Sequence, residues 1–130
     1  KDVNGCTFTS NIFLSEPTEI LFNVTSSDFN GFGVSCHGAD DAEIIIFAPS
    51  GGTPNYDYSI NGGASYSNSL IYNNLTSGNY VVTVRDIVGC TSDTTVVITE
   101  PNQFDVQYTS TSNYNGVNVS IAIYLSFNTL

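Results

Sequence analysis

One internal repeat constrains the fold of this chain more than any other feature of its sequence. The segments 1–17, KDVNGCTFTSNIFLSEP, and 85–101, RDIVGCTSDTTVVITEP, are related by a constant offset of 84 residues. The identical positions are Asp2, Gly5, Cys6, Thr7, Glu16 and Pro17, which match Asp86, Gly89, Cys90, Thr91, Glu100 and Pro101. A fixed period indicates a tandem array, and this period has the size of a whole domain. We therefore expect residues 1–17 to end one unit, 18–101 to form a complete unit, and 102–130 to begin the next.

The stretch from Leu75 to Tyr80 predicts the start of a central strand. Leu75, Gly78 and Tyr80 have the spacing of a tyrosine corner, in which the tyrosine hydroxyl hydrogen-bonds back across the preceding turn. Beyond the corner, Tyr80, Val82 and Val84 alternate with residues of the opposite face, which is the period of a strand packed on a core.

A tight turn follows this strand at residues 86–89. Asp86 has the position from which an aspartate accepts hydrogen bonds from turn amides, and Gly89 tolerates a positive φ. We expect the chain to return as a strand that reaches Glu100, with Val96 and Ile98 facing inward.

Further short strands are expected at 18–25, 43–48, 55–61, 65–72 and 117–127. Val, Ile, Tyr and Phe supply most of the apolar residues, while Ser, Thr, Asn and Gly interrupt every window of helical length. Short strands separated by regular turns predict an all-β fold, an antiparallel β-sandwich of immunoglobulin-like architecture. A closed barrel is the alternative.

The charge of the chain excludes several classes of partner. The net charge is -10, with Lys1 and Arg85 as the only cationic side chains apart from histidine. Two cations cannot form a patch that displaces counterions from nucleic acid or binds an anionic membrane. No apolar run is long enough to cross a bilayer. Because the chain lacks an initiating Met and a signal peptide, we expect it to be a piece of a longer protein.

Three motifs in succession carry a resemblance to a known family. They are GVSCHGADDAEI (33–44), SGGTPNYDYSINGG (50–63) and LTSGNYVVTVRDIVGC (75–90), and the last is followed by VVITEP at 96–101. This succession resembles the repeats of SprB-type adhesins, very large cell-surface proteins of gliding Bacteroidetes.

The resemblance implies export to the cell surface by the type IX secretion route and a place in a long adhesive filament. It also implies that the partners of the unit are adjacent repeats of the same chain. One departure concerns residues 120–123, which read Ser-Ile-Ala-Ile where a following copy would carry its Ser-Cys-x-Gly loop.

The repeat assigns the cysteines to units. Cys36 and Cys90 belong to one copy, whereas Cys6 is the second cysteine of the preceding copy. In the oxidising surroundings that the resemblance implies, we expect a Cys36–Cys90 disulfide that stabilises the unit by roughly 4 kcal/mol. The alternative is a pair of buried thiols.

The sequence gives little support to an enzyme. His37 is the only histidine, and its neighbour Cys36 is too close in sequence to be oriented by it as a nucleophile. We interpret His37 as a solvated loop residue. Gly31-Phe32-Gly33 lacks the third glycine of a dinucleotide-binding loop. We therefore expect no catalytic residues and no cofactor.

An acidic cluster is the candidate metal site. Asp40, Asp41 and Glu43 offer hard oxygen ligands of the kind that Ca²⁺ prefers, with Asp86 or Asp93 approaching from another loop. A solvated loop beside the start of a strand is the alternative interpretation.

Two further groups of residues are candidates for contacts with glycans. Tyr56, Tyr58, Tyr66 and Tyr72 offer flat aromatic faces to sugar rings, although core packing is the alternative use. Asp93-Thr94-Thr95 resembles the acceptor sequence for O-linked glycans in secreted Bacteroidetes proteins, with Thr94 as the modified residue.

Two functions follow from these observations. The first is a structural and adhesive repeat module, a stiff spacer in a secreted surface filament used in attachment or gliding. The second is a carbohydrate-binding module, with or without Ca²⁺ dependence, that recognises polysaccharide. Surface polysaccharide and other cell-surface proteins are the candidate partners outside the chain. We also expect the partial flanking units, at 1–17 and 117–127, to pair with this domain or with a neighbouring molecule because each exposes an unpaired strand.

Overall fold

The computed structural model describes residues 3–112 and 119–127, and no helix occurs in this part of the chain. Lys1, Asp2 and Val117, on which parts of the sequence-based expectations rest, lie outside the described residues. The strands are β1 (Val24–Ser26), β2 (Ala42–Ile46), β3 (Tyr56–Ser59), β4 (Ile71–Leu75), β5 (Gly78–Asp86), β6 (Thr91–Ile98), β7 (Phe104–Ser112) and β8 (Val119–Phe127).

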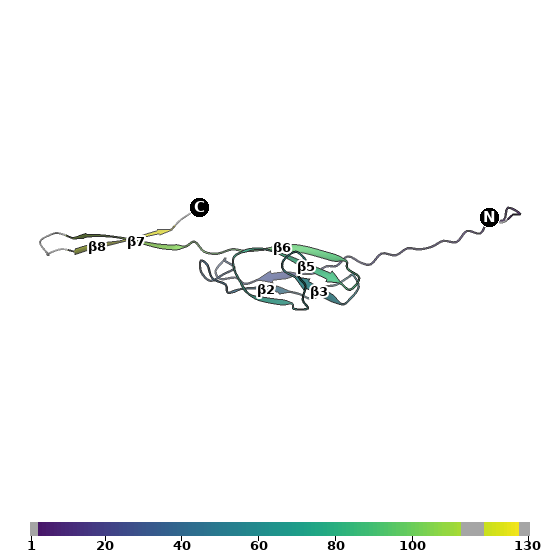
Figure 1. The fold of residues 1–130 in the computed structure, drawn as a ribbon, viewed down its shortest axis with the longest axis horizontal. Coiled ribbons are helices and arrows are strands. Elements are labelled where there is room, and N and C mark those ends of the chain that lie inside the picture. The colour runs from purple at the N-terminus through teal and green to yellow at the C-terminus, as the bar shows by residue number, and fades with distance from the viewer. Residues whose placement is uncertain (1–2, 113–118, 128–130) are drawn as a thin grey trace.

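Strands β1 to β6 form two three-stranded antiparallel sheets that pack face to face (Figure 1). One sheet has the order β1-β2-β4 and the other the order β3-β5-β6. The all-β sandwich is therefore confirmed, and the two separate sheets argue against the closed barrel. An immunoglobulin sandwich places strands A, B and E opposite C, F and G. The immunoglobulin-like subtype stays a prediction, which the order of β1 to β6 supports.

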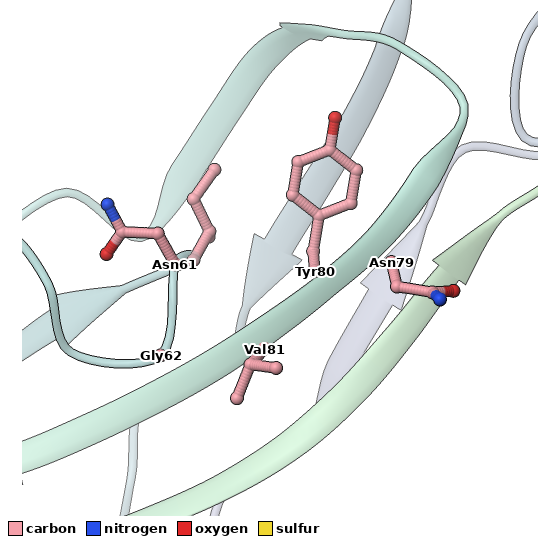
Figure 2. A pocket seen from close by; sticks show the side chains of 6 residues that line it. Asn61, Gly62, Asn79, Tyr80 and Val81 are labelled. Atoms are coloured by element: carbon pink, nitrogen blue, oxygen red, sulfur yellow. The ribbon is translucent and has the colours of Figure 1, made fainter.

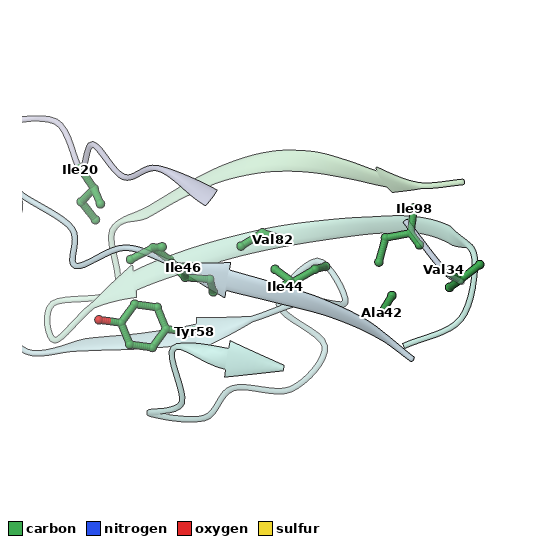
Figure 3. Packing of buried hydrophobic residues seen from close by; sticks show 9 residues of the cluster. Ile20, Val34, Ala42, Ile44, Ile46, Tyr58, Val82 and Ile98 are labelled. Carbon is green, nitrogen blue, oxygen red and sulfur yellow. The ribbon is translucent and has the colours of Figure 1, made fainter. Parts of the chain in front are cut away.

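The core lies between the two sheets because alternate residues of the central strands face inward. Ile44 and Ile46 of β2 lie close to Val82 of β5 (Figure 3). Val84 of β5 belongs to the same cluster, and all four side chains are almost fully buried. The other buried apolar residues are Ile20, Val34, Ala42, Tyr58 and Ile98. Among the residues whose burial the structure describes, every member of this core lies between Ile20 and Ile98.

Two predicted strands are shorter or shifted in the structure. The strand expected at 18–25 is reduced to β1, although Leu21 still forms an isolated bridge with Ser50. The strand expected at 65–72 begins only at Ile71. Side-chain hydrogen bonds compete with the strand ladder in this loop. The Asn61 side chain, for example, accepts from the Ser65 amide at 3.0 Å.

The two flanking segments differ from each other. Residues 7–17 are exposed and form no strand, so the expected pairing of this segment is not seen. The preceding turn does recur: Gly5 has a φ of 86° and its counterpart Gly89 a φ of 97°. At the other terminus, β8 pairs along its whole length with β7 in a hairpin that extends away from the sandwich (Figure 1). The described part of the strand expected at 117–127, Val119–Phe127, is thus paired within this chain.

The chain enters and leaves the sandwich at opposite ends (Figure 1). We call the first the proximal end, where the Gly52 amide donates to the Thr18 carbonyl at 2.7 Å. We call the second the distal end, where the amides of Gly33 and Val34 donate to the Thr99 carbonyl at 2.9 and 3.3 Å. Figure 3 shows Ile20 at one end of the core and Val34 with Ile98 at the other.

Candidate functional site

Asp86 organises the proximal end of the sandwich. Its side chain is 3% exposed, and its two oxygens accept from three backbone amides. Thr53 N lies 2.9 Å from Oδ2, while Val88 N and Cys90 N lie 3.0 and 2.8 Å from Oδ1. The Thr53 hydrogen bond is the main reason that the pKa of Asp86 is lowered; the turn amides add to this effect, and burial opposes it. One carboxylate therefore holds the β5–β6 turn against the loop that receives the incoming chain.

Glu100 organises the distal end in a similar way. Its Oε2 accepts from the Gly38 amide at 2.8 Å and lies 3.4 Å from Nδ1 of His37. This contact joins the 33–41 loop to the chain two residues beyond the end of β6. His37 was predicted to be a solvated loop residue, and its exposed side chain agrees with that interpretation. This contact was not predicted, although Glu100 and its counterpart Glu16 are identical across the repeat.

The two cysteines of the unit lie at opposite ends of the sandwich, which corrects the expected disulfide. Cys36 and Cys90 are both free and exposed, so the alternative of buried thiols is also wrong. Cys90 precedes β6, and Cys36 lies two residues beyond Val34, which binds Thr99 just after β6. The nine residue steps from Cys90 to Thr99 run along extended chain, so these two residues lie about 30 Å apart. A disulfide requires Cα atoms within about 7 Å.

The candidate calcium ligands are not brought together. Asp41 lies at the distal end, where its Oδ1 accepts from the Ser35 amide at 3.1 Å, whereas Asp86 lies at the proximal end. The contact with Ser35 lowers the pKa of Asp41. Asp93 faces outward from β6 and is exposed. Among the described residues, no group of three or more metal-binding side chains gathers.

The tyrosines do not form an open platform. Tyr58 belongs to the core, and burial raises the pKa of its hydroxyl. Tyr72 donates to the Tyr58 carbonyl at 3.0 Å, and Tyr56 donates to the carbonyl of Gly51. The ring of Tyr66 lies under the guanidinium of Arg85 at 3.8 Å.

Arg85 also connects two neighbouring strands of one sheet, β5 and β3. Its Nη2 lies 2.9 Å from Oδ2 of Asp57, the residue opposite it on β3. Because both side chains are partly exposed, this ion pair contributes little to stability. The ion pair nevertheless engages the single arginine of the chain.

The tyrosine-corner residues make the hydrogen bond that their spacing requires. Tyr80 Oη donates to the Thr76 carbonyl at 3.0 Å, just before the start of β5. Tyr80 also borders a shallow surface pocket of about 470 Å³ (Figure 2). The pocket is lined by Ile60, Asn61, Gly62, Asn79, Tyr80 and Val81. It contains no ionisable side chain that could act as a general acid or base near neutral pH.

The structure also places the two remaining candidates from the sequence, Thr94 and the 31–33 segment. Thr94 lies opposite Val82, on the inner side of β6, and is half-buried; this position is unfavourable for the proposed glycan. Gly33 is needed for packing, because a Cβ there would lie 2.6 Å from Cγ2 of Ile98. The 31–33 segment therefore has a structural explanation and forms no nucleotide-binding loop.

No helix of the described residues is long and apolar enough to cross a membrane.

Comparison with known proteins supports the family resemblance for part of the chain. No curated protein and no solved structure matches the chain. Residues 34–65 match the model of the SprB repeat family, and this segment includes β2 and β3 with the loops on either side of them. The match confirms, over this segment, the resemblance seen in the sequence.

Proposed function

We propose that residues 18–101 act as a stiff, non-enzymatic spacer in a secreted surface adhesin of gliding Bacteroidetes. The partners of each unit are the adjacent repeats of the same chain. The observation that carries this proposal is the position of the two ends: the chain enters the sandwich at one end and leaves it at the other (Figure 1). Units joined in this way extend in series.

The length of the connection supports stiffness. Thr99 is bound at the distal end, and Thr18 is bound at the proximal end. The offset of 84 makes Asn102 the counterpart of Thr18, so the two anchors are three positions apart in the sequence, with Glu100 and Pro101 between them. They span at most about 10 Å, and Pro101 fixes one of the torsions.

The family supports the location of the module. SprB repeats are modules of cell-surface proteins. The finer assignments to a gliding adhesin, to the type IX route and to adhesion belong to this proposal.

The residues that a carbohydrate-binding module would use have other contacts. Tyr56, Tyr58 and Tyr72 hydrogen-bond to backbone or pack in the core, and the acidic residues are divided between the two ends. These contacts favour the spacer over the lectin-like alternative.

Small-angle scattering tests the spacer on a chain in which residues 18–101 are duplicated in place. We expect the maximum dimension to grow by about 40 Å over the original chain, which is the length of one sandwich and its linker. The control replaces residues 100–102 at the junction with a long Gly-Ser segment, which should broaden the distance distribution. Two copies that lie side by side would contradict the proposal.

A glycan array and a calcium titration separate the two functions on the original chain. A spacer gives no glycan binding and no change in melting temperature with Ca²⁺. Saturable binding to a polysaccharide, lost on Tyr66→Ala, would favour the carbohydrate-binding module.

A further inference from the structure

The positions of Cys36 and Cys90 are explained by the junction between units. Each thiol is free and exposed, and the pair is too far apart to join within one sandwich. Yet each lies at the end of the sandwich where a neighbouring unit would be attached.

Cys36 is held beside the outgoing chain. Its carbonyl accepts from the Ala39 amide at 3.1 Å, and the next two residues, His37 and Gly38, both contact the Glu100 carboxylate. Glu100 is the first of the two residues between the anchors Thr99 and Asn102. The loop that carries the thiol therefore borders the start of the linker.

Cys90 is held beside the incoming chain. Its amide binds Oδ1 of Asp86, and Oδ2 of the same carboxylate binds the Thr53 amide. The preceding residue, Gly52, binds the Thr18 carbonyl. The turn that carries this thiol therefore borders the end of the linker.

We propose that a disulfide joins Cys36 of one copy to the counterpart of Cys90 in the copy that follows. This inference rests on the proposed function, because it requires units in series. The linker of about 10 Å brings the distal end of one unit against the proximal end of the next. The two exposed thiols then face the same junction from opposite sides.

The reaction is an oxidation of two thiols. Two S–H bonds are lost and one S–S bond forms, with the release of two protons and two electrons. A small-molecule disulfide, such as glutathione disulfide, accepts the electrons and is reduced to two thiols by exchange.

The test uses the chain with residues 18–101 duplicated in place and with Cys6→Ser. The junction variant keeps Cys36 of the first copy and Cys90 of the second copy, and the other two cysteines are changed to serine. The matched control keeps Cys90 of the first copy and Cys36 of the second copy, which lie at the two outer ends. All substituted thiols are exposed, so both variants are expected to fold.

After incubation with glutathione disulfide, we expect the junction variant to lose two hydrogens in mass without forming dimers. The oxidised fraction should be independent of protein concentration because the two thiols belong to one chain. The control should stay reduced or form only intermolecular species. A junction variant that stays reduced, or a control that oxidises equally within the monomer, would overturn the proposal.

Small-angle scattering from the same two variants shows whether the disulfide proposal alone has failed or whether the spacer proposal has failed as well. An extended pair of units with reduced junction thiols rejects the disulfide alone. A compact pair rejects the serial arrangement itself.

Discussion

At the scale of single residues, the unit depends on a few side chains that connect distant segments. Asp86 is the clearest case, because its carboxylate binds amides from both the 51–53 loop and the β5–β6 turn. The requirement for an acceptor with two oxygens also explains why an aspartate begins this turn. An amide side chain would place a donor where backbone amides already donate.

The pH dependence of stability tests this role. The pKa of Asp86 is lower in the folded state than in the unfolded chain, where it is about 3.9. Its contribution is therefore present above that value and is lost as the pH falls through the folded pKa. We expect Asp86→Asn to lower the melting temperature at pH 7 and to flatten its decline in acid. Thermal melts between neutral and strongly acidic pH measure both effects.

Asp93→Asn is the control for this prediction, because Asp93 is exposed on the outer face of β6. Its acid profile should follow that of the original chain. Identical profiles for the Asp86 and Asp93 variants would contradict the role of Asp86. The acid dependence that remains in Asp86→Asn should include a part from Asp41, whose pKa is also lowered.

The two faces of one sheet allow a second comparison at this scale. Ile44 is fully buried, whereas Ile71 on the outer face is 48% exposed. We expect Ile44→Ala to reduce the free energy of unfolding by about 2 to 5 kcal/mol through lost transfer energy and a cavity. Ile71→Ala should change it by less than about 1 kcal/mol. Urea denaturation measures both, and equal losses would contradict the placement of the core.

At the scale of elements, the strands of the sandwich and those of the C-terminal hairpin differ in how many neighbours stabilise them. Strand β5 lies between two partners, β3 and β6, and packs on the opposite sheet. Strands β7 and β8 pair only with each other in the described residues. A two-stranded hairpin alone is marginally stable in water.

Amide hydrogen exchange tests this difference. We expect amides of β7 and β8 to exchange at least tenfold faster than the inner amides of β5, because opening the hairpin exposes little core. Mass spectrometry of peptic fragments resolves the two regions within one sample. Equal protection would mean that the hairpin packs on a further surface.

The sequence predicted the elements whose pattern is continuous and strong. The alternation at Val82 and Val84, the tyrosine corner and the Asp86 turn each depend on neighbouring residues, so their spacing was sufficient. The start of β4 was not predicted, because the hydrogen bonds of Asn61 and Ser69 determine where the loop ends.

The positions of the site candidates could not be read from the sequence either. The distance between Cys36 and Cys90 depends on which end of the sandwich each loop occupies, and that follows from the sheet order. The same topology divides Asp41 from Asp86. Local patterns carry no information on such long-range placement.

At the scale of the whole molecule, the proposed junction disulfide changes how an array responds to force. Without it, an unfolded copy contributes all 84 residues of the repeat to the length of the chain. With a bridge at each junction, force passes between copies through sulfur, and only the residues between Cys36 and Cys90 can be extended. We expect the contour length of an array to fall from about 290 Å to about 190 Å per unfolded copy.

Single-molecule pulling of a multi-copy chain measures this change under oxidising and reducing conditions. Replacing every Cys36 by serine is the control, and it should give the longer value in both conditions. An array whose contour length is insensitive to reductant would contradict the prediction.

The short connection between Thr99 and the counterpart of Thr18 also has a consequence for the surface of an array. Since every junction has the same linker, each copy is turned by the same angle relative to the one before it. The half-exposed Phe47, which follows β2, and Ile71 of β4 would then recur as an evenly spaced stripe that winds around the filament. Adding a copy lengthens the stripe by one fixed step. The length of the filament and the number of apolar positions along it therefore increase together.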